Sequence, residues 1–280
     1  MSLENLVKDI YHTVANGIGK FNDKNVNELN KSITNSVHKQ LLSKNRVPRS
    51  SLRMSNIGKP ECQLWHELNG SPQEELEPHV RIKFLFGDII EALLLFLVKE
   101  SGYKVTHEQS KVQVEGIVGH IDCKIEGVTV DVKSASSYAF KKFQNGTITD
   151  DDPFGYIGQL SGYAHADNKT EAGFLAMDKQ MGKIAYLNVD EIDMIDVPKR
   201  IKHLKKVVKS KTPPQRCFKD EEDGKSGNMK LGRNCSYCNF KDTCWSDANN
   251  GDGLRLFLYS TGPRWLTHVE REPDVYEVTN

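Results

Sequence analysis

The pattern of apolar and polar positions predicts helices on both sides of a set of strands. In residues 1–50, apolar side chains recur every three or four positions and predict helices with polar outer faces. A longer stretch, residues 79–100, is apolar almost all round and predicts a buried helix. Runs typical of β-strands, punctuated by glycines, follow to about residue 135, and residues 154–167 predict another helix.

The rest of the chain predicts a strand pair, a helix and a separate C-terminal segment. Ala172–Met177 and Ile184–Val189 are typical of two strands joined by a turn, and Asp190–Lys209 fits a helix. An irregular linker covers residues 211–232, and a hairpin closes the chain. We therefore expect three parts: a helical segment over 1–50, a core over 51–210 and a cysteine-containing segment with the hairpin over 211–280.

Composition and charge limit the classes of protein that fit this outline. The 280 residues carry 38 basic and 38 acidic side chains, a balance that argues against indiscriminate coating of nucleic acid. Residues 199–211 are nevertheless strongly basic, which fits a solvated helix face and a DNA-facing surface equally well. The longest apolar run, Ile89–Val98, is too short to span a bilayer, and the N-terminus has no signal-peptide pattern. We expect a cytoplasmic protein without a membrane partner, in a cell or in the host of a virus.

The most informative segment, residues 119–133, predicts two strands with a tight turn between them. Because strand side chains alternate between faces, Asp131 and Lys133 share one side of the second strand. Asp122 belongs to the polar face of the first strand, and the two polar faces can meet. The segment thus predicts two carboxylates and a lysine in one place, whereas Cys123 lies on the apolar face and is assigned to the core.

A group of this kind suits phosphodiester hydrolysis. The reaction needs the phosphate charge neutralised and a hydroxide formed near neutral pH, and Mg²⁺ or Mn²⁺ held by carboxylates provides both. The lysine can stabilise the developing charge or orient the attacking water, and desolvation can lower its pKa for such a role. An exposed hairpin with ordinary surface charges would show the same Asp-x-Lys pattern, so the interpretation depends on further elements in the expected order.

Two predicted helices supply these elements. Glu91 is a lone carboxylate inside the long apolar helix, which is costly unless the group is paired or binds metal. Asp88, one helical turn away, is the competing candidate. In the helix over 154–167, Gln159 and Tyr163 are four positions apart and share a face, from which both can hydrogen-bond the phosphate or the lysine.

Taken in order, these motifs resemble those of the RecB-like nucleases of the PD-(D/E)xK superfamily. That family carries a helix with Gly and then His or Glu, a G-x-x-D strand, a (D/E)-x-K strand and a Q-x-x-x-Y helix. The chain matches over roughly residues 81–165 with, in order, Gly87 and Glu91, Gly119 and Asp122, Asp131 and Lys133, and Gln159 and Tyr163. Each motif is weak alone, and four in order are a specific signal.

The resemblance implies an α/β fold of the restriction-endonuclease type, with a mixed central sheet flanked by helices. It also implies a divalent-metal site formed by Glu91, Asp122, Asp131 and the Val132 carbonyl. Many relatives have histidine where this chain has Glu91, and an all-carboxylate set favours Mg²⁺ while leaving Mn²⁺ open. The general style of the chain also resembles phage-encoded members of the family.

Three cysteines near the C-terminus, Cys235, Cys238 and Cys244, follow the spacing C-x2-C-x5-C. Thiols so close together in a reducing compartment indicate a metal site, with zinc as the default and a chance group of buried cysteines as the alternative. A subset of RecB-like nucleases, which includes a CRISPR-associated group and AddB-type subunits, is similar in ending with this spacing, and it binds a 4Fe–4S cluster. The resemblance implies such a cluster here, completed by a fourth cysteine that lies upstream of the core in the relatives.

Two residues compete to be the fourth cysteine ligand. Relatives often show Ser, four residues, and then Cys-Pro-Arg, whereas here Ser55 is followed by Pro60, Glu61 and Cys62, so that Cys62 stands two places late. Cys217 lies in the same C-terminal region as the other three cysteines. Both are candidates on the sequence alone.

The sequence therefore favours an exonuclease that acts on DNA ends in recombination, replication or DNA degradation. The choice of an exonuclease comes from the family resemblance alone. The expected partner is DNA with free ends or single-stranded regions, and the sequence identifies no protein partner. The alternatives are a restriction-like endonuclease, although nothing resembles a separate target-recognition domain, and a metal-stapled DNA-binding module whose carboxylates are structural.

Overall fold

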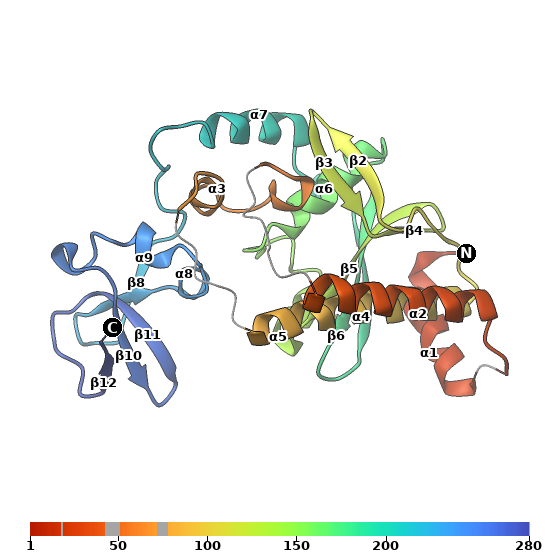
Figure 1. Ribbon diagram of the computed structural model, residues 1–280, viewed down its shortest axis with the longest axis horizontal. Helices are drawn as coiled ribbons and strands as arrows, with labels where there is room; N and C mark the ends of the chain where they lie inside the picture. Colours follow the sequence, from red (N-terminus) through yellow and green to blue (C-terminus); the bar gives the residue numbers. More distant parts are fainter. Residues whose placement is uncertain (18, 43–50, 72–77, 280) are drawn as a thin grey trace. The chain divides into compact units, whose positions relative to one another are not determined.

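The computed structural model describes residues 1–17, 19–42, 51–71 and 78–279 (Figure 1). The chain divides into two compact units, and each contains segments that are distant in the sequence. Unit 1 comprises Met1–Val47, Leu52–Gly58 and Leu76–His203, and unit 2 comprises Pro48–Ser51, Lys59–Glu75 and Leu204–Asn280. The boundary predicted at residue 50 lies outside the described residues. Within the described ranges, none of the helices combines the length and apolar character needed to cross a membrane.

A mixed sheet forms the centre of unit 1, as predicted. Its strands, in spatial order, are β1 (Val105–Thr106), β4 (Cys123–Ile125), β5 (Val128–Ala135), β6 (Ala172–Asp178) and β7 (Ile184–Val189). β5 and β6 run parallel, whereas the other neighbours are antiparallel. A separate two-stranded sheet contains β2 (Ser110–Val114) and β3 (Ile117–Ile121). All seven residues of β6 are buried, which places this strand in the middle of the core.

Helices flank both faces of this sheet. The helices of unit 1 are α1 (Leu6–Asn16), α2 (Asp23–Val37), α4 (Pro78–Glu100), α5 (Ser137–Asn145), α6 (Tyr156–Ala166) and the first part of α7 (Val197–Val207). One core cluster joins α1 and α4 to the sheet, a second joins α5 and α6 to it, and α2 packs beside α4. α5 was not predicted, because its only clear signals are local: the Ser136 hydroxyl accepts a hydrogen bond from Ala139 N–H, and Gly146 ends the helix with φ 75°.

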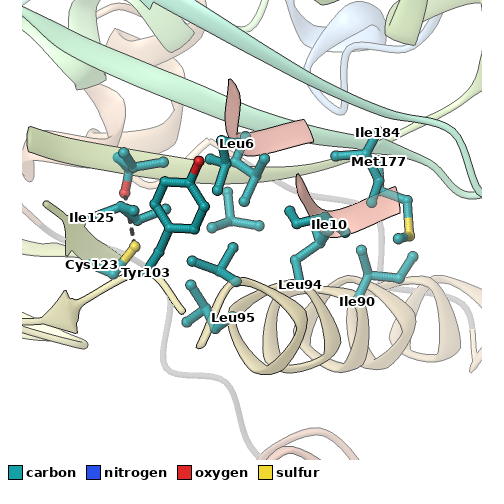
Figure 2. Packing of buried hydrophobic residues seen from close by; sticks show 14 residues of the cluster. Leu6, Ile10, Ile90, Leu94, Leu95, Tyr103, Cys123, Ile125, Met177 and Ile184 are labelled. Atoms are coloured by element: carbon teal, nitrogen blue, oxygen red, sulfur yellow. Dashed lines mark hydrogen bonds between the residues drawn. The ribbon is translucent and has the colours of Figure 1, made fainter. Parts of the chain in front are cut away.

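The first core cluster shows how the long apolar helix is used. Leu94 of α4, Ile10 of α1 and Cys123 of β4 belong to this one cluster, and all three side chains are 0 % exposed (Figure 2). The assignment of Cys123 to the core is therefore confirmed. The expectation that the whole helix is buried is wrong for its N-terminal half, since Ile82 and Phe86 are each 55 % exposed.

Unit 2 contains an antiparallel sheet of short strands. In spatial order these are β12 (Tyr276–Val278), β10 (Arg255–Tyr259), β11 (Gly262–His268), β9 (Met229–Leu231) and β8 (Asp220–Glu222). The predicted terminal hairpin is β10 and β11. The linker predicted over 211–232 is wrong in part, because β8 and β9 lie within it; each is three residues long and lacks the alternation that signals a strand. The unit also contains α3 (Glu61–Leu68), α8 (Arg233–Ser236) and α9 (Lys241–Cys244).

Candidate active site and cysteine cluster

β5 carries two of the predicted catalytic residues into the interior of unit 1. In the parallel register with β6, Asp131 lies opposite Phe174 and Lys133 lies opposite Ala176. The Asp131 side chain is 1 % exposed, and its Oδ1 atom has no hydrogen-bond partner among the described residues. The Lys133 amine forms an ion pair with this carboxylate. An acid that is buried with an unsatisfied oxygen is costly unless it serves a further partner.

Asp122 lies beside this pair, at the junction between β3 and β4. Its Oδ2 atom accepts a hydrogen bond from the Val132 N–H at 2.8 Å, which fixes the carboxylate against β5. Burial, with the added negative charges of Asp131 and Glu91, raises the pKa of Asp122 well above its ordinary value. The shift indicates that acids from three separate elements lie close enough to repel one another.

Glu91 of α4 completes this acidic group through an amide that the sequence analysis missed. Gln109 donates from Nε2 to Glu91 Oε1 at 2.7 Å, and the same nitrogen lies 3.5 Å from Asp122 Oδ1. Burial raises the pKa of Glu91 and outweighs the lowering by this hydrogen bond, and Asp131 raises the pKa further. Gln109 has φ 52°, a left-handed conformation that no motif in the sequence announced.

Asp88, the competing candidate on α4, has different partners. Gln40 donates to Asp88 Oδ2 at 2.8 Å, and the Lys39 amine lies 3.2 Å from the same oxygen. Asp88 nevertheless lines the same hollow as Glu91 and Asp122, which has a volume of about 510 Å³. The structure therefore brings both candidates to the cavity, one ion-paired with a lysine and one in contact with the acidic group.

The two predicted residues of α6 form a chain of hydrogen bonds that ends at the lysine. Lys133 Nζ lies 3.4 Å from Gln159 Oε1, and Gln159 Nε2 donates to the Tyr163 hydroxyl at 3.1 Å. Tyr163 is 2 % exposed, so it contacts Gln159 rather than an open surface. Gly119 leaves room for this ring, since a Cβ there would lie 2.8 Å from Tyr163 Cε1 and 2.5 Å from Met54 Cβ. The glycine of this motif is thus a packing residue.

The pKa of the Lys133 amine differs from the expectation. Burial alone would lower the pKa of the amine, but the negative charges of Asp131 and Asp122 outweigh burial and raise the pKa above its ordinary value. The expected lowering considered desolvation without the two carboxylates that surround the amine. The Lys133 amine is therefore a cation in this arrangement, suited to stabilising negative charge.

The cysteine cluster lies within unit 2 and includes both candidates for the fourth ligand. The Cys62 N–H donates to Cys217 Sγ at 3.2 Å, and Cys62 Sγ lies 3.8 Å from Cys244 Sγ. Cys235 and Cys238 border the same small cavity, which has a volume of about 40 Å³. Five thiols from distant parts of the chain therefore meet, one more than a four-cysteine site requires.

These thiols differ in acidity because they hydrogen-bond one another. A hydrogen bond with Cys62 lowers the pKa of Cys217 to about 6, and another with Cys62 lowers the pKa of Cys244 to about 7. Burial raises the pKa of Cys235 to about 11. The thiolate is the form that binds metals, and at neutral pH this arrangement favours it at Cys217 and to a lesser degree at Cys244.

A histidine adds a nitrogen donor that the sequence analysis did not consider. Cys62, His66 and Cys244 offer donor atoms within 4.8 Å of one another, and across the described ranges this is the one set of three with such spacing. The Nδ1 atom of His66 is hydrogen-bonded to Ser71 Oγ at 2.8 Å, and burial lowers the pKa of the ring and so favours the neutral imidazole. The four-residue spacing of Cys62 and His66 on α3 was a readable signal.

Comparisons with known proteins give distant structural likenesses. No protein-family model matches the chain, and no curated protein matches its sequence. Among solved structures the chain is similar to SSO0001, with 13% identity and a TM-score of 0.42 over 75% of this chain and 93% of that one. It is also similar to LHK-Exo, an alkaline exonuclease from Laribacter hongkongensis, with 14% identity and a TM-score of 0.35 over 61% and 94% of the two chains. The complex of LHK-Exo with dAMP gives 14% identity and a TM-score of 0.31, over 61% and 80%.

Proposed function

We propose that the protein is a divalent-metal-dependent deoxyribonuclease of the PD-(D/E)xK type that acts from DNA ends. The observation that carries the proposal is the buried Asp131 carboxylate, which has an unsatisfied oxygen next to Lys133. Asp122 and Glu91 repel it electrostatically, and a cation would relieve this repulsion. Carboxylate oxygens are the ligands that Mg²⁺ and Mn²⁺ prefer, so the donor set fits such an ion.

Each residue of the group has a role in this proposal. Glu91, Asp122, Asp131 and the Val132 carbonyl would hold the ion, which supplies charge neutralisation and a more acidic water when bound. Lys133 stabilises the negative charge that develops on the phosphate. Gln159 accepts a hydrogen bond from the lysine and directs it, and Tyr163 in turn holds Gln159, as described above.

The hydrogen-bond partners favour Glu91 over Asp88 as the metal ligand from α4. The Asp88 carboxylate already pairs with the Lys39 amine and accepts a hydrogen bond from Gln40, so a cation would have to compete with a lysine there. Glu91 instead shares the Gln109 amide with Asp122. The raised pKa of Glu91 indicates that nearby positive charge does not offset the burial of its carboxylate. A cation at Glu91 and Asp122 would satisfy both acids at once.

Incubation of linear and covalently closed circular DNA with Mg²⁺, Mn²⁺ or EDTA tests the proposal. Loss of linear DNA alone, abolished by EDTA and by Lys133→Ala, is the expected result. Loss of both substrates would indicate an endonuclease and would retain the metal centre. If purified wild-type protein binds DNA but leaves both substrates intact in either metal, it is a binding module and the nuclease proposal fails.

We also propose that the cysteine cluster holds a structural cofactor. Four of the five thiols suit a 4Fe–4S cluster, and the backbone N–H bond to Cys217 Sγ is a contact that stabilises a metal-bound sulfur. A structural zinc ion is the alternative, and the Cys62, His66 and Cys244 donors favour it. Iron and sulfide analysis of protein purified without oxygen separates the two: stoichiometric zinc without sulfide would exclude the iron–sulfur assignment.

A further inference from the structure

An exposed aromatic stack lies beside the catalytic lysine, on the loop that leads into α6. Phe154 is 61 % exposed and stacks on Tyr156, with 5.5 Å between ring centroids and 26° between ring planes. The Lys133 amine lies 4.6 Å from the centroid of the same Tyr156 ring. Together these distances place the Phe154 ring within about 10 Å of the amine, which corresponds to no more than about three nucleotides at ~3.4 Å each.

The backbone next to Phe154, which is exposed, is fixed by packing and by a hydrogen bond. Gly155 has φ 77°, and a Cβ there would lie 2.2 Å from the Gly58 carbonyl carbon, so the loop is closely packed at this point. Asp152 Oδ2 accepts a hydrogen bond from the Ile157 N–H at 2.7 Å and fixes the turn into α6. Exposing a phenyl ring forgoes the free energy of its burial, and a held, exposed ring near a reactive centre is typical of a contact surface.

We propose that Phe154 is a stacking platform for an unpaired nucleobase at the end of a DNA strand. The inference rests on the proposed nuclease function and names its substrate class. Inside a duplex, neighbouring bases cover both faces of every base, so an aromatic side chain finds a free face only at an end or in a single strand. Base–aromatic stacking is tolerant of sequence, which suits an enzyme that degrades DNA from its ends.

The charges around the ring agree with contact to a base rather than to phosphate. Asp151 pairs with the Lys142 amine, and Asp152 is held at the start of α6, so these acids organise the loop. The uncharged face of Phe154 is what the loop offers to a ligand. The phosphate contact is then made by the Lys133 amine, which lies over the same Tyr156 ring.

A binding assay with the full-length protein in EDTA tests the platform without cleavage. The probe is a single-stranded oligonucleotide with a fluorescent adenine analogue at one of its terminal positions, whose emission falls when the base stacks. Wild-type protein should quench the analogue near one end, and Phe154→Ala should abolish the quenching and weaken binding about tenfold. Phe154→Trp should retain both effects, and closed circular duplex should not compete.

Phe21→Ala is the matched control. Phe21 is also an exposed phenylalanine of unit 1: it is 50 % exposed and contacts Phe96, with 5.6 Å between ring centroids and 51° between ring planes. Its loss should leave the quenching unchanged. If the alanine variant misfolds, Phe154→Leu keeps an apolar side chain but no ring, so equal quenching by the Leu and Trp variants overturns the platform.

The same measurements separate the two proposals. Quenching that depends on Phe154, in a protein that cleaves no DNA with Mg²⁺ or Mn²⁺, would refute the nuclease and leave a single-strand binding site. Metal-dependent cleavage with quenching that is insensitive to Phe154 would refute the platform alone.

Discussion

Replacement of Glu91 by glutamine tests whether the acids of the group repel one another when no cation is bound. The Gln109 nitrogen lies 2.7 Å from Glu91 Oε1 and 3.5 Å from Asp122 Oδ1, which limits the separation of the two oxygens. For two unit charges at about 6 Å and an effective dielectric constant of about 20, Coulomb's law gives a repulsion of roughly 3 kcal/mol. The amide side chain has nearly the same shape and can still accept the hydrogen bond from Gln109.

We therefore expect Glu91→Gln to stabilise the metal-free protein. At roughly 2–4 °C per kcal/mol for a domain of this size, the melting temperature should rise by about 6–12 °C. Burial raises the pKa of Glu91 above 4.5, so the stabilising contribution of its protonated form is complete below pH 4.5 and is lost as the pH rises through the folded-state pKa. The advantage of the variant should accordingly grow as the pH rises from 4.5 toward neutrality.

Thermal melts in EDTA and in saturating Mn²⁺ give both halves of this prediction. Wild-type protein should gain stability from the ion, about 2.7 kcal/mol at a concentration 100 times the dissociation constant, and the variant should gain less. Asp88→Asn is the control one helical turn away: it loses the Lys39 ion pair, so it should not be stabilised in EDTA and should respond to metal as wild type does. A lower melting temperature for Glu91→Gln in EDTA would refute the crowding argument.

Three further outcomes are expected. Lys133→Ala should reduce single-turnover cleavage at least ~100-fold with metal-free DNA affinity little changed; a near-wild-type rate would remove the lysine from the mechanism. Gly119→Ala should cost about 1–3 kcal/mol in denaturant unfolding, because the added methyl meets the Tyr163 ring; unchanged stability would contradict that packing. Cys62→Ser and Cys217→Ser, made separately, should differ in bound metal, since one thiol completes the four-cysteine set; equal, undiminished metal content in both would exclude each as a required ligand.

The parts of the fold that were predictable are those whose signal is periodic. The alternation of residues 119–133 places Ile121, Cys123 and Ile125 in the core and leaves His120 exposed, as the structure has it. The four-residue spacing of Gln159 and Tyr163 likewise becomes a hydrogen bond on α6. The second case follows from the geometry of one helix, whereas in the first the predicted single strand before the turn is two strands, β3 and β4, and the alternation of faces continues across Asp122 between them.

The parts that were not predictable depend on contacts between distant segments. β8 contains three acidic residues in succession and is a strand only because β9 pairs with it. Gln109, itself in a left-handed conformation, reaches the acidic group from a turn, and its partner Glu91 lies on a helix 18 positions earlier. No local pattern encodes either arrangement, because the free energy that stabilises it comes from tertiary contacts.

The division of the chain into two interleaved units sets the order in which the units can fold during synthesis. Cys62 leaves the ribosome long before Cys244, from which it is separated by 182 positions, and the continuous segment Leu76–His203 of unit 1 is made between them. Domains fold as they emerge from the ribosome, so unit 1 can form before residues 204–280 of unit 2 have been synthesised. If the cysteines hold the proposed cofactor, its insertion would then be a late event, and a cell short of the metal would accumulate chains in which unit 1 has formed and unit 2 has not.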